Sequence, residues 1–154
     1  MTTRGAWGLV IDGRAIVSPH AAEPTPSALG ARVLEWAREQ QSWGEVRVRA
    51  QCLRVADEGP DRDPRVTLEC GSVVHQDDLA YDTRACEWAY LVDLDDDALE
   101  VYAGRPAKGT PPVGRFWDDR PDWEAITRVA VFSLYALPTT DQFVAQLHGL
   151  AASA

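Results

Sequence analysis

Two tryptophans, Trp117 and Trp123, flank a short acidic run, Asp118-Asp119-Arg120-Pro121-Asp122. Glycines and prolines between Arg105 and Pro121 predict an extended loop there, where large aromatic side chains have little core to fill. Aromatic rings and carboxylates on a surface are typical anchors for protein or cationic partners. We therefore predict a partner-binding surface formed by Trp117, Asp118, Asp119 and Trp123.

A second acidic cluster, Asp93 and Asp95 to Asp97, has the side chains that bind a hard cation. A calcium loop of the EF-hand type starting at Asp93 would need Gly at its sixth position and Glu at its twelfth, which are Ala98 and Gly104 here. The sequence favours a solvated hairpin turn instead. His20, His75 and His148 have no metal-ligand spacing, so no metal site is predicted.

The three cysteines, Cys52, Cys70 and Cys86, are odd in number, widely spaced and free of any C-x-x-C pair. Neither a disulfide framework nor a zinc site is indicated, and we predict reduced, buried thiols. The sequence also lacks a Walker loop, a dinucleotide fingerprint, a G-x-S-x-G elbow and H-E-x-x-H, so no cofactor is predicted.

Length and composition favour a single domain over residues 1–154, with 45% apolar residues and six tryptophans to build its core. The net charge of −9 disfavours direct binding to nucleic acid or to an anionic membrane and leaves a cationic partner open. No run approaches the roughly 18 apolar residues of a membrane helix, and no export signal is recognised. We therefore expect a soluble cytoplasmic protein.

The chain must position these side chains through a mixed set of elements. Residues 6–11 and 14–18 alternate around Asp12-Gly13 and predict an N-terminal hairpin. After a loop over residues 19–26, apolar residues at helical spacing predict a helix of about 14 residues, with Thr25 or Ser27 as N-cap and Pro26 in the first turn. Trp36 in this helix and Trp88 later in the chain are expected in the core.

Residues 45–84 show less regular patterns of apolar residues. Residues 45–56 fit a helix or a strand, and we favour the helix. Residues 57–64 are predicted as a charged loop, residues 65–69 as a short strand, and residues 76–84 as the site of a short helix.

The C-terminal half has clearer patterns. Residues 87–94 and 98–102 predict a second hairpin, and the apolar run over residues 126–134 predicts a central strand. Thr139 and Gln142 have capping-box spacing ahead of a C-terminal helix. Together these elements predict an α+β fold with a mostly antiparallel sheet and packed helices.

Several segments resemble a family of small uncharacterised bacterial and phage proteins that begin M-G-T-R-G. The resemblance is carried by TRGAWGLVIDG, the Ser27 to Gly30 run, CEWAYLVDLDDDALEVYAG, the Gly114-Arg115-Phe116 triplet and FSLYALPTTDQF. It covers both ends and about half of the chain, and its most specific part is the EWAY-V-DLD-LEVY hairpin. The middle looks shorter than in the family, and the family's Y-N-H-F-D-S-Y-P segment is replaced by Ser18 to Glu23. The family carries no assigned activity, and any function of the replaced segment is in doubt here.

The opening Thr2-Thr3 followed by GAWGLVIDG is also similar to the first strand of N-terminal-nucleophile (Ntn) hydrolases, whose sandwich fold is then the expectation. In that chemistry Met1 is removed, Thr2 Oγ attacks a carbonyl and the Thr2 amine takes the proton. The partners available on or after the second strand are Arg14, His20 and Glu23. The alternative is a structural hairpin with no chemistry at its start.

Two functions remain open from the sequence. The first, which we favour, is a non-catalytic binding or accessory protein that docks a cationic or protein partner through its acidic surface. The second is an amide-bond hydrolase with Thr2 as nucleophile and base.

Overall fold

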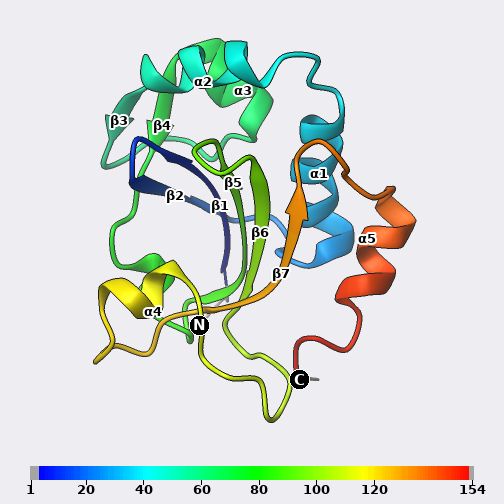
Figure 1. Ribbon diagram of the computed structural model, residues 1–154. Helices are drawn as coiled ribbons and strands as arrows, with labels where there is room; N and C mark the ends of the chain where they lie inside the picture. Colours follow the sequence, from blue (N-terminus) through cyan, green and yellow to red (C-terminus); the bar gives the residue numbers. More distant parts are fainter. Residues whose placement is uncertain (1–3, 153–154) are drawn as a thin grey trace.

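The protein is built around a five-stranded mixed sheet, which Figure 1 shows in a computed structural model that describes residues 4–152. In spatial order the strands are β2 (Arg14–His20), β1 (Arg4–Ile11), β5 (Cys86–Asp93), β6 (Ala98–Ala103) and β7 (Thr127–Ser133). β1 and β5 run parallel, and all other neighbours are antiparallel. The predicted α+β class with a mostly antiparallel sheet is therefore confirmed.

The helices and a small second sheet complete the fold. The helical elements are the π-helical turn η1 (Pro26–Gly30), α1 (Ala31–Arg38), α2 (Trp43–Gln51), α3 (Pro64–Cys70), the 3₁₀ turn η2 (Leu79–Tyr81), α4 (Arg115–Asp119) and α5 (Thr140–Leu147). β3 (Arg54–Ala56) and β4 (Ser72–Val74) pair in parallel beside the main sheet. None of the described helices is long and apolar enough to cross a membrane.

Both predicted hairpins are confirmed. Asp12 and Gly13 have φ values of 51° and 77°, the pair of positive values that a type I′ turn needs, and they join β1 to β2. The second hairpin joins β5 to β6, with Asp93 opposite Ala98 and with Asp97 at a φ of 53°. The two hairpins lie side by side because β1 pairs with β5.

One face of the sheet is covered by α1, α2 and α5, with α1 and α5 beside each other in Figure 1. Trp36 and Trp88, each 5% exposed, belong to this core as predicted. The predicted N-terminal helix forms as η1 followed by α1, with Pro26 in its first turn after Thr25. The predicted capping box of α5 is confirmed, since Thr139 and Gln142 bond to each other's backbone N–H.

The opposite face is covered by η2, α4 and the segments around them. Tyr102, Phe116 and Ile126 form its apolar centre, with Leu91 and Val10 from the sheet below. The η2 and α4 segments pack on this second core with their apolar side chains. Their polar side chains lie at the surface above it.

Residues 65–69, predicted as a short strand, lie instead in α3, so that prediction is wrong. Asp63 is the N-cap and accepts a hydrogen bond from Val66 N at 3.0 Å, Pro64 starts the first turn, and Gly71 ends the helix at a φ of 73°. These are standard helix start and stop signals. The favoured helix over residues 45–56 forms as α2, and the chain then changes to β3.

The apolar run over residues 126–134 forms β7, but β7 is an edge strand and not the predicted central one. Its residues pack on one side against the core below α5, while Val131 is 53% exposed. The predicted loop over residues 105–121 contains α4, whose Phe116 docks into the second core.

Candidate functional site

A candidate site forms where η2 meets α4 and the segment that follows it. Ile126 N donates to Ala80 O at 3.0 Å, which ties the two segments together. The Phe116 ring packs edge-on against Tyr81 and Tyr102, with centroid distances of 5.5 and 5.1 Å. The core therefore holds both segments from below.

Gly114 allows α4 to come this close to the sheet. Its φ is 122°, and an added Cβ would lie 2.8 Å from the Tyr102 ring and 3.2 Å from Arg128 Cβ. Only glycine combines that backbone conformation with that contact. The Gly114-Arg115-Phe116 triplet thus places α4 over Tyr102.

Arg120 lies at the centre of the surface formed by these segments. Its guanidinium carbon is 4.1 Å from the Tyr81 ring centroid and 4.9 Å from the Trp123 ring centroid. Its Nη1 donates to Asp78 and its Nη2 to Asp77, both at 3.0 Å. The hydrogen bonds to Asp78 and Asp77 raise the pKa of Arg120, and the bond from Arg120 lowers the pKa of Asp77.

The structure brings three of the four predicted binding residues to this surface. Asp118 and Asp119 are exposed on α4, and Trp123 is 47% exposed beside Tyr81. Asp119 accepts the Tyr81 hydroxyl at 2.5 Å; burial, with Asp119 adding to it, raises the pKa of Tyr81. Trp117 differs from the prediction, because it is half-buried in α4 and its indole N–H donates to Thr127 Oγ1 at 3.0 Å.

Two surface cavities lie on either side of Tyr81. The larger, about 650 Å³, is bounded by the start of β2, His75, Arg115 and the Asp118-Asp119 end of α4. The smaller, about 430 Å³, is bounded by Asp78, Asp82, Arg84, Asp122, Trp123 and Glu124. Volumes of this size suit a small ligand or one partner side chain.

The lining of both cavities offers charge and aromatic surface for recognition. Asp118, Asp122 and Glu124 are exposed and make no side-chain hydrogen bond or ion pair within the described part of the chain. His75 Nδ1 accepts a hydrogen bond from Val17 N at 3.0 Å, and its Nε2 lies 3.6 Å from Asp77 Oδ1. The lining residues thus present free carboxylates rather than a free histidine base.

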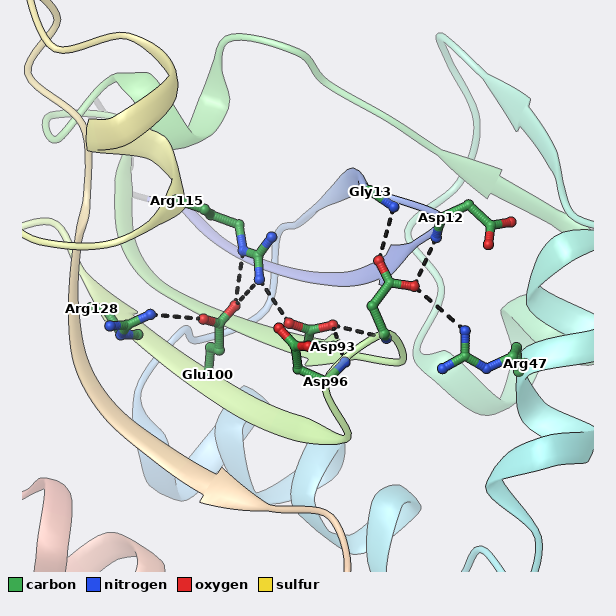
Figure 2. Close-up of polar contacts among 9 residues, drawn as sticks. Asp12, Gly13, Arg47, Asp93, Asp96, Glu100, Arg115 and Arg128 are labelled. Atoms are coloured by element: carbon green, nitrogen blue, oxygen red, sulfur yellow. Dashed lines mark hydrogen bonds and ion pairs between the residues drawn. The ribbon is translucent and has the colours of Figure 1, made fainter.

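A buried charge network holds Arg115, which lines the larger cavity, and Figure 2 shows the contacts of this network. Arg115 donates from Nε to Glu100 at 2.9 Å and from Nη2 to Asp93 at 2.8 Å, and Arg128 donates to Glu100 at 3.1 Å. Asp93 and Glu100 are 2% and 4% exposed. Because both carboxylates are bonded to arginine, this network fixes the start of α4 on the sheet.

The acidic turn predicted as solvated is instead tied into the fold at two positions. Asp93 is buried and accepts from Asp95 N and Asp96 N at 2.9 and 3.0 Å. Asp95 accepts from Gly13 N and Asp12 N at 2.8 and 2.9 Å, and these bonds, that of Gly13 first, lower its pKa (Figure 2). The turn therefore joins the two hairpins through protein donors.

The cysteines differ in exposure, which corrects the prediction that all are buried. Only Cys86 is buried, and that burial raises the pKa of its thiol to about 12, whereas Cys52 and Cys70 are exposed.

Since the thiolate is the reactive form, we expect two thiols of the native protein to react with an aromatic disulfide reagent at neutral pH. The third should react only in denaturant. Cys86→Ser should leave the native count at two, and three fast thiols would contradict this assignment.

The predicted nucleophile Thr2 lies outside the described residues. β1 begins at Arg4, whose N–H donates to Ala85 O at 2.9 Å, and Ala85 lines the smaller cavity. Of the three proposed partners, Arg14 lines the larger cavity and His20 is buried, its pKa lowered chiefly by that burial.

No known protein family, no curated protein and no solved structure matches this chain. The functional proposals therefore depend on the geometry of the described residues.

Proposed function

We propose that this chain is a non-catalytic binding or accessory protein of the cytoplasm that docks a basic segment of a partner protein on the surface around Tyr81. The observation that carries the proposal is a set of three unpaired, exposed carboxylates in the two cavities that Tyr81 lines: Asp122 and Glu124 line the smaller cavity together with the exposed Trp123, and Asp118 lines the larger one. An exposed aromatic ring with free carboxylates around it supplies both contact area and charge complementarity to lysine and arginine side chains.

The charge of the surface agrees with this proposal. Asp77, Asp78 and Asp82 lie beside the three free carboxylates, and the chain as a whole carries a net charge of −9. A basic partner would therefore be attracted before contact and retained at the aromatic rings.

The test is binding of a fluorescent arginine-rich peptide at low salt. We expect Asp118→Asn combined with Asp122→Asn and Glu124→Gln to weaken binding about tenfold, since three rim carboxylates each contribute a fraction of a kcal/mol. Raising the salt concentration should abolish most of the difference.

A matched control removes the same charge elsewhere. Asp57→Asn, Glu58→Gln and Glu69→Gln neutralise three exposed carboxylates, two directly after β3 and one in α3, that line neither cavity. This control should bind the peptide as the wild type does. Equal losses in both variants would show a response to net charge alone and would contradict a localised site.

The alternative function remains the amide-bond hydrolase with Thr2 as nucleophile. It is favoured by one contact, the Arg4 N–H bond to Ala85, which places the start of β1 beside the smaller cavity. Intact mass decides whether Met1 is removed. If Met1 is absent, a screen of amide substrates against Thr2→Ala follows, and turnover that survives this substitution would reject the hydrolase.

A further inference from the structure

The side chain of Arg120 is held by contacts that complement each part of a guanidinium group. One face lies over the Tyr81 ring at 4.1 Å, with the Trp123 ring at 4.9 Å, and the two terminal nitrogens each meet a separate carboxylate at 3.0 Å. Tyr81 and Trp123 pack edge-on at 6.1 Å, so the two rings form one aromatic corner. Planar stacking plus forked hydrogen bonds is how proteins recognise arginine rather than lysine.

This arrangement lies at the surface. The side chains of Asp77 and Asp78 are 69% and 68% exposed, and that of Arg120 is 28% exposed. Arg120 follows the last residue of α4, where Pro121 ends the helix. Its guanidinium therefore fills a surface site and not a hole in the core.

The rest of the site does not depend on Arg120. Phe116 anchors α4 in the core, Trp117 is bonded to Thr127, and Ile126 N to Ala80 O joins the two segments. Tyr81 is also held by Asp119 and Phe116. The arginine side chain can leave while these contacts keep the Tyr81 ring in place, with Trp123 packed edge-on against it.

We infer that Tyr81, Trp123, Asp77 and Asp78 form a binding site for a guanidinium group, which Arg120 occupies in the free protein and which an arginine of a partner takes over. We call these four residues the guanidinium site. The existence of the site stands on its own geometry, and its use by a partner rests on the proposed function. Arg120 then acts as an internal competitor, and the apparent affinity for an external arginine is the intrinsic affinity multiplied by the fraction of time the site is empty.

The first experiment tests the site itself with ethylguanidinium. Arg120→Ala empties the site, and tryptophan fluorescence should report saturable binding of ethylguanidinium at millimolar concentration, with at least a tenfold weaker response from the wild type. Ethylammonium is the matched probe and should bind much less tightly, because it has no planar group to stack on the aromatic rings and no forked pair of N–H donors for the two carboxylates. Arg120→Ala combined with Asp77→Asn and Asp78→Asn, which keeps Trp123 as the reporter, should lose the response.

The outcomes are distinct. A response equal for the two probes, or equal in wild type and Arg120→Ala, would overturn the guanidinium site. Circular dichroism establishes that the variant is folded, and Arg120→Gln, which keeps a polar side chain of similar length, repeats the test if alanine disturbs α4.

The second experiment tests use of the site by a partner, with the arginine-rich peptide and its lysine counterpart. Arg120→Ala should bind the arginine peptide about tenfold more tightly than the wild type does and should gain less for the lysine peptide. If ethylguanidinium binds to Arg120→Ala but no peptide binds to either protein, the site stands and the proposed function fails. If peptides bind and Arg120→Ala binds them less tightly, docking stands and the role of Arg120 as competitor is overturned.

Discussion

Arg115→Met is expected to lose about 3–5 kcal/mol of unfolding free energy, the range measured when one partner of a buried ion pair is removed. The substitution leaves Asp93 and Glu100, which are 2% and 4% exposed, without the guanidinium that bonds to both. Methionine keeps much of the side-chain volume, so the loss reports the uncompensated charge rather than a cavity. Urea unfolding followed by far-UV circular dichroism measures the effect.

Arg128→Met is the matched control. Among the described residues the side chain of Arg128 bonds only to Glu100, and it is 34% exposed; Glu100 keeps Arg115 when Arg128 is replaced. A loss of about 1 kcal/mol or less is expected, as for a partly exposed pair. Equal losses of unfolding free energy in the two variants would show that Arg115, although it bonds to two buried carboxylates, stabilises the fold no more than Arg128 does.

Gly104→Ala is expected to lose about 3 kcal/mol, the upper end for overpacking a tight site. A Cβ at this position would lie 2.1 Å from Cys86 O and 2.9 Å from Thr83 O, both backbone atoms. Gly104 N also donates to Glu87 O at 2.9 Å, so the chain cannot move away without breaking that bond. Thermal unfolding and urea unfolding should both show the loss.

Gly44→Ala, the same substitution at another glycine, is expected to raise the unfolding free energy. Gly44 lies in the first turn of α2, where the nearest atom to an added Cβ is Ser42 Oγ at 3.7 Å. Alanine favours the helix, so a gain of about 0.5–1 kcal/mol is expected. A destabilised Gly44→Ala together with an unaffected Gly104→Ala would contradict both steric assignments.

The parts of the fold that could be predicted are those governed by neighbouring residues. Asp12-Gly13 has the chemistry of a type I′ turn, and Thr139 with Gln142 has the spacing of a capping box. Each signal lies within a few residues and needs no tertiary contact. Both elements formed as predicted.

The two errors in secondary structure have different causes: one depends on a tertiary position and the other on helix boundaries within the sequence. The apolar content of β7 matches a central strand, yet β7 lies at the edge because β6 is its one neighbour among the described strands of the sheet. Residues 65–69 taken alone are compatible with a short strand, but Asp63-Pro64 starts a helix before them and Gly71 ends it after them. Recognising those caps would have corrected the second error but not the first.

The candidate site was predictable from one of its two segments. The aromatic and acidic residues around Trp123 lie in a single stretch of sequence, and their composition predicts a binding surface. Asp77, Asp78 and Tyr81 come from another part of the chain. Arg120 and Asp78 are 42 residues apart, so no local pattern could pair them. Glu100 carried one signal, a charge between Leu99 and Val101 in an apolar strand, but its burial depends on α4 covering that face.

The parallel pairing of β1 with β5 also sets the order in which the molecule can assemble. Each hairpin closes through neighbouring residues, but their union joins Asp12 to Asp95, which are 83 residues apart. Contacts of such long range carry the largest loop-closure cost and form late. On a ribosome, β1 and β2 would therefore emerge as a pair with one open edge and wait for β5. The residues of the crossover from β2 to β5, which contains η1 through η2, must be synthesised before the centre of the sheet can close.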